Sequence, residues 1–243
     1  MLSATIASMR HVLLSCALFA CGSVKSAPDA AVDGSGTIDA PMIDALTIDA
    51  PPDACVPTPV FLGGMDPVAQ GWTVNKSGAA TISTAGPSIT SLVTTTTGTS
   101  GAYQLLSKAG LVTPGQPFDI ELNMQVNAVN PHNSFDGAAV LMARYSGGFG
   151  DGTDRAQMLY VDGDRLGWTD DTASFLSNSL DGAFHTYRLK VDSGGNATVY
   201  RDGISVLTRV GYVTNGTLAF GDQTNDANIE SSLYIRSLTL RCP

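Results

Sequence analysis

The segment from Phe118 to Val126 alternates strictly between apolar and polar residues. Because successive side chains of a β-strand point to opposite faces, this pattern predicts a strand with one buried and one wetted face. Most of the chain after Cys55 reads similarly, as short β runs separated by clusters of Gly, Asn, Asp and Ser, without convincing helical periodicity. We therefore expect an all-β domain.

Local signals place the turns and one irregularity of this domain. Asp162-Gly163, the run 193–196 and Asp202-Gly203 supply residues that tolerate the positive φ angles of tight turns. The apolar positions of the last strand change phase near Arg236 and Ser237, which predicts a β-bulge. Residues 60–106 support only three or four strands. The remaining strands are expected at 138–145, 156–161, 166–169, 185–191, 197–200, 204–208, 217–220 and 233–240.

The start of the chain is typical of an exported bacterial protein. Residues 1–20 contain one arginine, no acidic residue, and an apolar stretch that is too short to span a bilayer. Leu18-Phe19-Ala20-Cys21 resembles the lipobox of bacterial lipoproteins, although Phe19 is a less usual middle residue. We expect residues 1–20 to be a signal peptide and Cys21 to carry the lipid, and Cys16 is a second candidate. Gly22 resembles the residue that follows the cysteine in lipoproteins passed to the outer membrane, so we expect that location.

Residues 21–54 repeat Ile-Asp-Ala and Pro-Asp-Ala triplets, with prolines that exclude a helix. Such a composition predicts a disordered, extended tether that leaves one domain at 55–243. The alternative is an acidic arm that collects calcium. The formal net charge of the whole chain is −9, and basic residues form no cluster, so nucleic acid is not an expected partner.

Two later segments carry a resemblance to a known superfamily. Residues 184–192, a glycine turn and residues 197–203, ending in Tyr200-Arg201-Asp202-Gly203, look like the signature hairpin of concanavalin A-like jelly rolls, which include lectins, glucanases and laminin G-like domains. Residues 218–222 followed by 233–235 resemble their closing strands, although Arg236 lies near the position where an Asp is often found. The resemblance covers residues 115–242 well and the N-terminal half of the domain loosely. It implies a two-sheet antiparallel jelly-roll sandwich, one sheet of which is concave.

The cysteines fit this architecture. If Cys21 is acylated and Cys16 is removed, Cys55 and Cys242 remain, and two cysteines in an oxidising compartment favour one disulfide. The resemblance implies adjacent first and last strands, which would bring these two cysteines together.

Catalytic motifs are missing from the sequence. Glucanases of the superfamily use Glu-x-Asp-x-x-Glu, of which Glu121 retains only the first position, and no other enzyme motif is present. His132 is expected to be a solvated loop residue and His185 a packed or capping residue. The sequence therefore argues against an enzyme, and a glycoside-active hydrolase on the same fold is kept as an alternative.

Calcium is the one cofactor that the sequence suggests. The acid-rich segments 149–154 and 222–226 offer oxygen ligands, without EF-hand spacing. The superfamily often binds calcium near the rim of its fold, so Asp222, Asn225 and Asp226 are the preferred ligands.

A polar sheet face is the candidate ligand surface. If Asp162-Gly163 is a two-residue turn, Trp168 falls on the apolar face, and Tyr160 opposes Arg165 on the polar face. We expect the domain to bind carbohydrate, with an ordinary solvated face of an interaction or structural domain as the alternative. If their strands are neighbours, the binding side chains are Glu121, Asn123, Gln125, Arg144, Tyr160 and Arg165.

Overall fold

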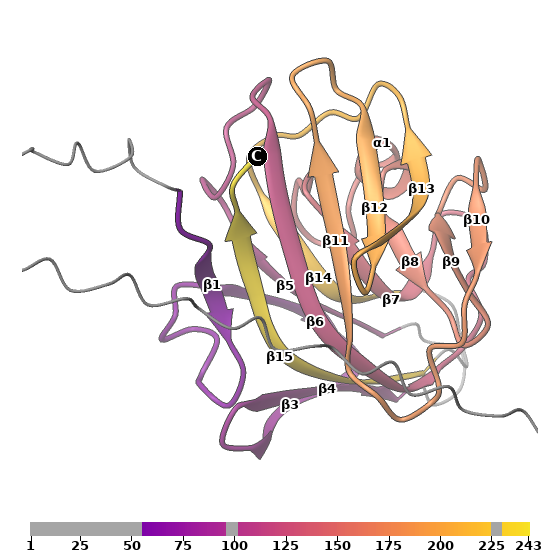
Figure 1. The fold of residues 1–243 in the computed structure, drawn as a ribbon. Helices are drawn as coiled ribbons and strands as arrows, with labels where there is room; N and C mark the ends of the chain where they lie inside the picture. Colours follow the sequence, from indigo (N-terminus) through magenta and orange to yellow (C-terminus); the bar gives the residue numbers. More distant parts are fainter. Residues whose placement is uncertain (1–54, 96–101, 225–229) are drawn as a thin grey trace, which may run out of the picture. The chain divides into compact units, whose positions relative to one another are not determined.

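The protein is described here from a computed structural model, which covers residues 55–95, 102–224 and 230–243. The expected signal peptide, Cys21 and the tether lie outside the described residues, as do Asn225 and Asp226. Fifteen β-strands and one short helix form in the described ranges, and the strands build two antiparallel sheets (Figure 1). No helix among them is long and apolar enough to cross a membrane. The prediction of an all-β, two-sheet antiparallel sandwich is confirmed.

The first sheet, called sheet A, contains both ends of the domain. Its strand order is β13-β12-β11-β6-β15-β4-β3, and β1 pairs with β15 outside this path. Strands β15, β6, β11 and β12 lie side by side at the front of Figure 1. The bounds are β1 Thr58–Leu62, β3 Ala79–Gly86, β4 Ile89–Thr95, β6 Phe118–Val129, β11 His185–Val191, β12 Ala197–Arg201, β13 Ile204–Arg209 and β15 Ser231–Arg241.

The second sheet, called sheet B, packs behind sheet A in the same view (Figure 1). Its strand order is β10-β9-β8-β7-β14-β5-β2. The N-terminal part of the domain contains five strands, β1 to β5, so the expectation of three or four strands was too low. Strand β3 has no buried residue, which explains why its sequence lacks an apolar pattern. The bounds in sheet B are β2 Thr73–Ser77, β5 Tyr103–Lys108, β7 Gly137–Met142, β8 Leu159–Val161, β9 Arg165–Trp168, β10 Ser174–Leu176 and β14 Leu218–Gln223.

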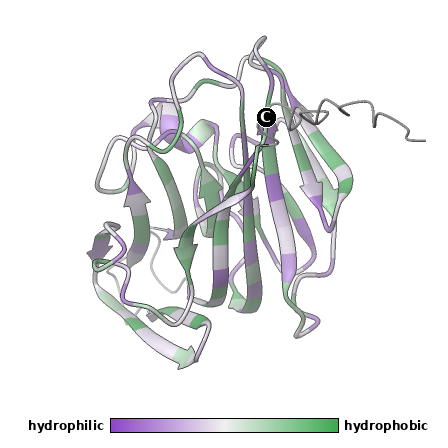
Figure 2. Ribbon diagram, turned by 60° about the vertical axis from the view of Figure 1, so that its left-hand side comes forward, coloured by the Kyte–Doolittle hydropathy of each residue, from purple (hydrophilic) through white to green (hydrophobic). Residues whose placement is uncertain are grey.

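The main core lies between the two sheets. Alternate residues of β6 point into it, as the sequence predicts, and hydrophobic and hydrophilic bands alternate along the strands in Figure 2. Three aromatic rings form its centre: Phe61, Trp72 and Phe220 contact one another edge to face, with ring centroids 5.1–5.8 Å apart. Trp168 is fully buried in the same core, as expected for the apolar face.

The expected irregularities occur with one change. The register of β15 shifts between Ile235 and Ser237, which confirms the bulge. The turn after β8 is not centred on Asp162-Gly163, because the amide of Asp162 donates to the carbonyl of Arg165 at 2.7 Å and so places Gly163 and Asp164 at its centre. The predicted strand 156–161 is also shorter than expected, because helix α1, Gly152–Ala156, precedes β8.

The first and last strands are adjacent, as the resemblance implied. Strand β1 pairs with β15 from Thr58 opposite Leu240. Just beyond this ladder, Cys55 and Cys242 form a disulfide, with their Cα atoms 5.7 Å apart. The predicted bond is therefore confirmed.

Candidate functional site

The six predicted sugar-binding residues lie on two different sheets. Glu121, Asn123 and Gln125 belong to β6 of sheet A, whereas Tyr160 and Arg165 belong to β8 and β9 of sheet B. Arg144 follows β7, also in sheet B. Because the sheets pack against each other through their inner faces, their outer faces point in opposite directions. The prediction that the six side chains share one surface is wrong.

The outer face of sheet A is tied together by its own side chains. Glu121 accepts a hydrogen bond from Arg241 at 3.0 Å, and Gln125 donates to Asn127 at 2.7 Å. Arg188 binds the fully buried carboxylate of Asp119 through two nitrogens.

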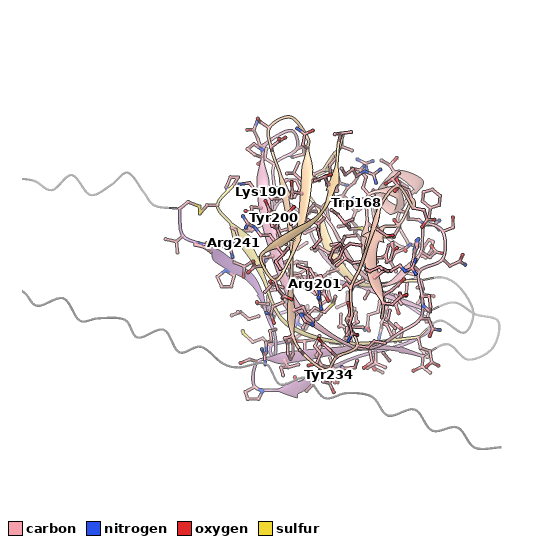
Figure 3. The ribbon with its side chains drawn as sticks, turned by 45° about the vertical axis from the view of Figure 1, so that its right-hand side comes forward. Trp168, Lys190, Tyr200, Arg201, Tyr234 and Arg241 are labelled. Carbon is pink, nitrogen blue, oxygen red and sulfur yellow. A yellow bond between two sulfur atoms is a disulfide. The ribbon has the colours of Figure 1, made fainter. Side chains whose placement is uncertain are left out.

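The guanidinium of Arg188 also lies over the ring of Tyr200, 4.9 Å from the ring centroid. Figure 3 labels three residues of this sheet, Lys190 on β11, Tyr200 on β12 and Arg241 on β15. These contacts pair the carboxylates of Asp119 and Glu121 with guanidinium groups, so neither carboxylate is left with an unbalanced charge for a ligand.

Arg144 supports helix α1. Its Nε lies 3.2 Å from Asp154, which is fully buried, and its Nη2 lies 3.7 Å from Asp151. Asp151 caps the helix by accepting from the amides of Thr153 and Asp154 at 2.8 Å. The segment that offered calcium ligands in the sequence therefore uses its carboxylates to begin a helix.

Tyr160 is 2% exposed, contrary to the expectation of a wetted ring. The outer face of sheet B is covered by polypeptide, under which a second apolar cluster forms. The missed signal is that consecutive residues of β7 are all non-polar. This pattern is typical of a strand that is buried on both faces. The cluster contains Leu105, Val140, Met142, Tyr145, Met158, Tyr160 and Ala219.

A pocket of about 420 Å³ opens at the edge of this cluster and is called the His132 pocket. It is lined by Pro131, His132, Tyr160, Asp162, Asp164, Arg165 and Asp171. Two of the predicted residues, Tyr160 and Arg165, thus meet here, together with carboxylates that sequence reasoning did not select. The sequence pattern assigns Asp162 only to a turn and gives Asp164 no role, and no sequence signal shows that residues 131–132 and 162–171 come together.

His132 forms one wall of the pocket. Its ring stacks on Tyr160 with centroids 4.0 Å apart, and its side chain is only 6% exposed. Nδ1 lies 2.5 Å from the carbonyl oxygen of Asp136, and Nε2 lies 3.1 Å from Asp171. The expectation that His132 is solvated is wrong, because the loop that carries it folds onto sheet B.

The carboxylates of the pocket differ in environment. Asp162 is 3% exposed, and burial raises its pKa from 3.8 to about 6, against the smaller effect of the backbone N–H of His132. That N–H donates to both carboxylate oxygens, at 2.9 and 3.0 Å. Asp164 is exposed and bonded to Arg165, and this hydrogen bond lowers the pKa of Asp164. A buried carboxylate of raised pKa in a pocket is a common property of functional sites.

Two of the three non-glycine residues with a left-handed backbone in the described part of the chain belong to the loops that form the pocket. Asp171, with φ of 58°, lines it, and Phe135, with φ of 67°, lies in the same loop as His132. Left-handed non-glycine residues cost about 1–3 kcal/mol and cluster at binding and catalytic sites. The loops are held by the hydrogen bond from the amide of Phe135 to the carbonyl of Thr169, at 2.8 Å.

The preferred calcium ligand Asp222 is engaged elsewhere. Its buried carboxylate accepts hydrogen bonds from the hydroxyls of Thr94, Ser231 and Thr224 and from the amide of Thr224. Among the described residues, no group of three or more His, Cys, Asp or Glu side chains is arranged to hold a metal ion.

His185 is packed, as expected. Its Nδ1 lies 2.7 Å from Asp202, and its Nε2 lies 3.1 Å from Asp181. The amide of Thr186 donates to the same Asp202, so this signature Asp fixes the start of the hairpin.

Comparison with known proteins identifies the fold. No protein-family model and no curated protein sequence matches the chain. A carbohydrate esterase from Shiga toxin-encoding bacteriophage phi24B aligns at a TM-score of 0.52 with 13% identity, over 76% of this chain and 98% of that one. The domain shares the fold of this structure, a two-sheet antiparallel β-sandwich. The VIP36 exoplasmic/lumenal domain, in Ca²⁺/Man-bound form, aligns at 0.48 with 10% identity over 70% of this chain and 82% of that one, and the cellulose-induced protein Cip1 at 0.47 with 10% identity over 70% and 90%.

Proposed function

We propose that this domain binds carbohydrate and that the His132 pocket receives the sugar. The carrying observation is the pocket itself: its volume of about 420 Å³ lies in the range of small-ligand sites, and its polar groups are already held in place. Sugar hydroxyls both donate and accept hydrogen bonds. Asp164 and Asp171 supply acceptors, and Arg165 supplies a fork of donors.

A glycan array probed with the purified chain tests this proposal, followed by titration calorimetry with the best ligand. Arg165→Gln should weaken the binding of an uncharged glycan about 10-fold, because it removes the donor fork of the pocket. Arg236→Gln is the matched control, since Arg236 stacks on Phe184 outside the pocket. An array without any bound glycan, or equal affinity for wild type and Arg165→Gln, would contradict the proposal.

A glycoside-active hydrolase is a second candidate because of Asp162. Its pKa of about 6 leaves a fraction of the carboxyl protonated near neutral pH, as a general acid requires. A hydrolysis screen over polysaccharides separates the two functions: activity that Asp162→Asn abolishes would favour the enzyme, whereas binding without product favours the binding domain.

We further propose that the domain is exported and anchored to the outer membrane through a lipid on Cys21, with residues 21–54 as the tether. The support is the leader and the lipobox-like run that ends at Cys21. Radiolabelled palmitate should label the wild type and Cys16→Ala but not Cys21→Ala. Labelling that survives in Cys21→Ala would place the anchor elsewhere.

A further inference from the structure

We infer that the sugar held in the His132 pocket carries a free, positively charged amine. This inference rests on the proposed function and narrows its ligand to amino sugars whose nitrogen is not acetylated. The pocket combines an unbalanced negative charge with a buried carboxylate that forms no ion pair with a lysine or an arginine of the described chain.

At neutral pH, which lies above the pKa of about 6 of Asp162, the charge of the lining is negative whether or not His132 is protonated. Three carboxylates face one guanidinium and one imidazole. Asp164 and Arg165 neutralise each other through two contacts of 3.2 Å. Asp162 and Asp171 remain, and in the described part of the chain neither forms an ion pair with a lysine or an arginine.

Asp162 is the stronger argument of the two. A carboxylate can accept about four hydrogen bonds, and both oxygens of Asp162 accept from the same donor, the backbone N–H of His132. The side chain is almost completely removed from water, which disfavours its ionised form, and the attraction of His132 and Arg165 offsets this only in part, because the pKa of Asp162 stays raised. An ammonium group supplies both an opposite charge and three N–H donors.

Asp171 adds a second negative charge within reach of the same sugar. It contacts the ring of His132 at 3.1 Å, while Asp162 contacts the backbone of that residue. Its side chain is 66% exposed, so it remains open to a ligand. A hydroxyl would satisfy hydrogen bonds here but not the charge, and the carboxylate of an acidic sugar would be repelled.

The test compares ligands of equal length on the full chain. Glucosamine oligomers with free amines, the corresponding N-acetylglucosamine oligomers and a glucuronate-containing oligomer are titrated calorimetrically. We expect the free-amine oligomer to bind at least 10-fold more tightly than the acetylated one and the glucuronate oligomer to bind most weakly. Asp171→Asn should reduce the preference for the amine several-fold.

Asp181→Asn is the matched control, because Asp181 also contacts a histidine, His185, but lies outside the pocket. It must keep the full preference, since a loss in both variants would indicate attraction to the net negative chain and overturn the inference. Equal affinity for amine and acetylated oligomers would also overturn it while leaving carbohydrate binding intact. Absence of binding to every glycan would overturn the proposed function itself.

Discussion

The imidazole of His132 lies almost parallel to the phenol of Tyr160, with ring centroids 4.0 Å apart and 11° between the ring planes. Tyr160 belongs to sheet B, whereas His132 belongs to the loop before β7. This stack fastens that loop to the sheet, and the backbone N–H of His132 then reaches Asp162. This pair of rings therefore sets the shape of the pocket together with the hydrogen bond from the amide of Phe135 to the carbonyl of Thr169.

We predict that His132→Ala destabilises the domain and weakens glycan binding. Stacked aromatic pairs contribute about 0.5–1.5 kcal/mol beyond buried area, and the removed ring adds a burial loss, so a decrease of about 2 kcal/mol in unfolding free energy is expected. Urea denaturation measures it. His132→Phe keeps the stack and loses the contacts to Asp136 and Asp171, so it should recover most of the stability. Equal losses in both variants would show that the polar contacts hold the loop.

Gly167 is predicted to be essential for the position of Tyr160. A Cβ at residue 167 would lie 2.8 Å from both the Tyr160 hydroxyl oxygen and the carbonyl oxygen of Ala173. Gly167→Ala should therefore cost about 1–3 kcal/mol of unfolding free energy through overpacking, measured by thermal and urea unfolding. Gly152→Ala is the control, because a Cβ at residue 152 would have none of the described atoms within 4 Å and alanine favours the helix. Stability unchanged by Gly167→Ala would mean that both the Tyr160 ring and the backbone at Ala173 shift freely to admit the methyl group.

Local features of the fold could be predicted from the sequence. The period of two in residues 118–126 reports burial of one strand face, and the phase change near Arg236 reports the bulge, because both depend on neighbouring residues only. The pairing of Cys55 with Cys242 followed from the resemblance to a fold with adjacent terminal strands. The first two predictions needed no knowledge of which strands pair across the sheet, whereas the disulfide needed it and the resemblance supplied it.

The site could not be predicted in the same way. Glu121 and Tyr160 both occupy polar-looking alternate positions, but their strands pair within different sheets, and no local pattern records that pairing. The His132 pocket forms only where two segments about thirty residues apart in the sequence meet. The hydrogen bond between His132 and Asp162 joins these two segments. A loop residue such as Asp171 gives no periodic signal.

The disulfide is predicted to stabilise the domain substantially. Cys55 and Cys242 are separated by 187 residues, so the bond closes nearly the whole domain. On the chain-entropy model such a loop stabilises the folded state by up to about 5 kcal/mol. The double variant Cys55→Ser/Cys242→Ser should lose part of that value in urea denaturation, and the reduced wild type should behave identically. Two free thiols in the unreduced, denatured domain would refute the bond.

The last prediction concerns pH and rests on Asp222. Burial raises the pKa of this carboxyl from 3.8 to about 6 in the folded state. The folded protein therefore binds a proton more readily than the unfolded chain between these values. The cost of the buried charge is fully present above pH 6, is relieved as the pH falls, and is gone below about pH 4.

Asp222→Asn removes this titration. The pKa of Asp162 is also raised, but Asp162 is present in both proteins, so its contribution cancels in the difference between wild type and variant. The wild type should gain stability relative to the variant as the pH falls from 7 to 4, by up to about 3 kcal/mol at 1.36 kcal/mol per pKa unit. Asp192→Asn should show the opposite sign, because hydrogen bonds from Asn196 lower the pKa of Asp192. Urea denaturation at several pH values measures both differences. A difference for Asp222→Asn that does not change between pH 7 and pH 4 would mean that its carboxylate is stabilised in the ionised form by the hydroxyls of Thr94 and Ser231.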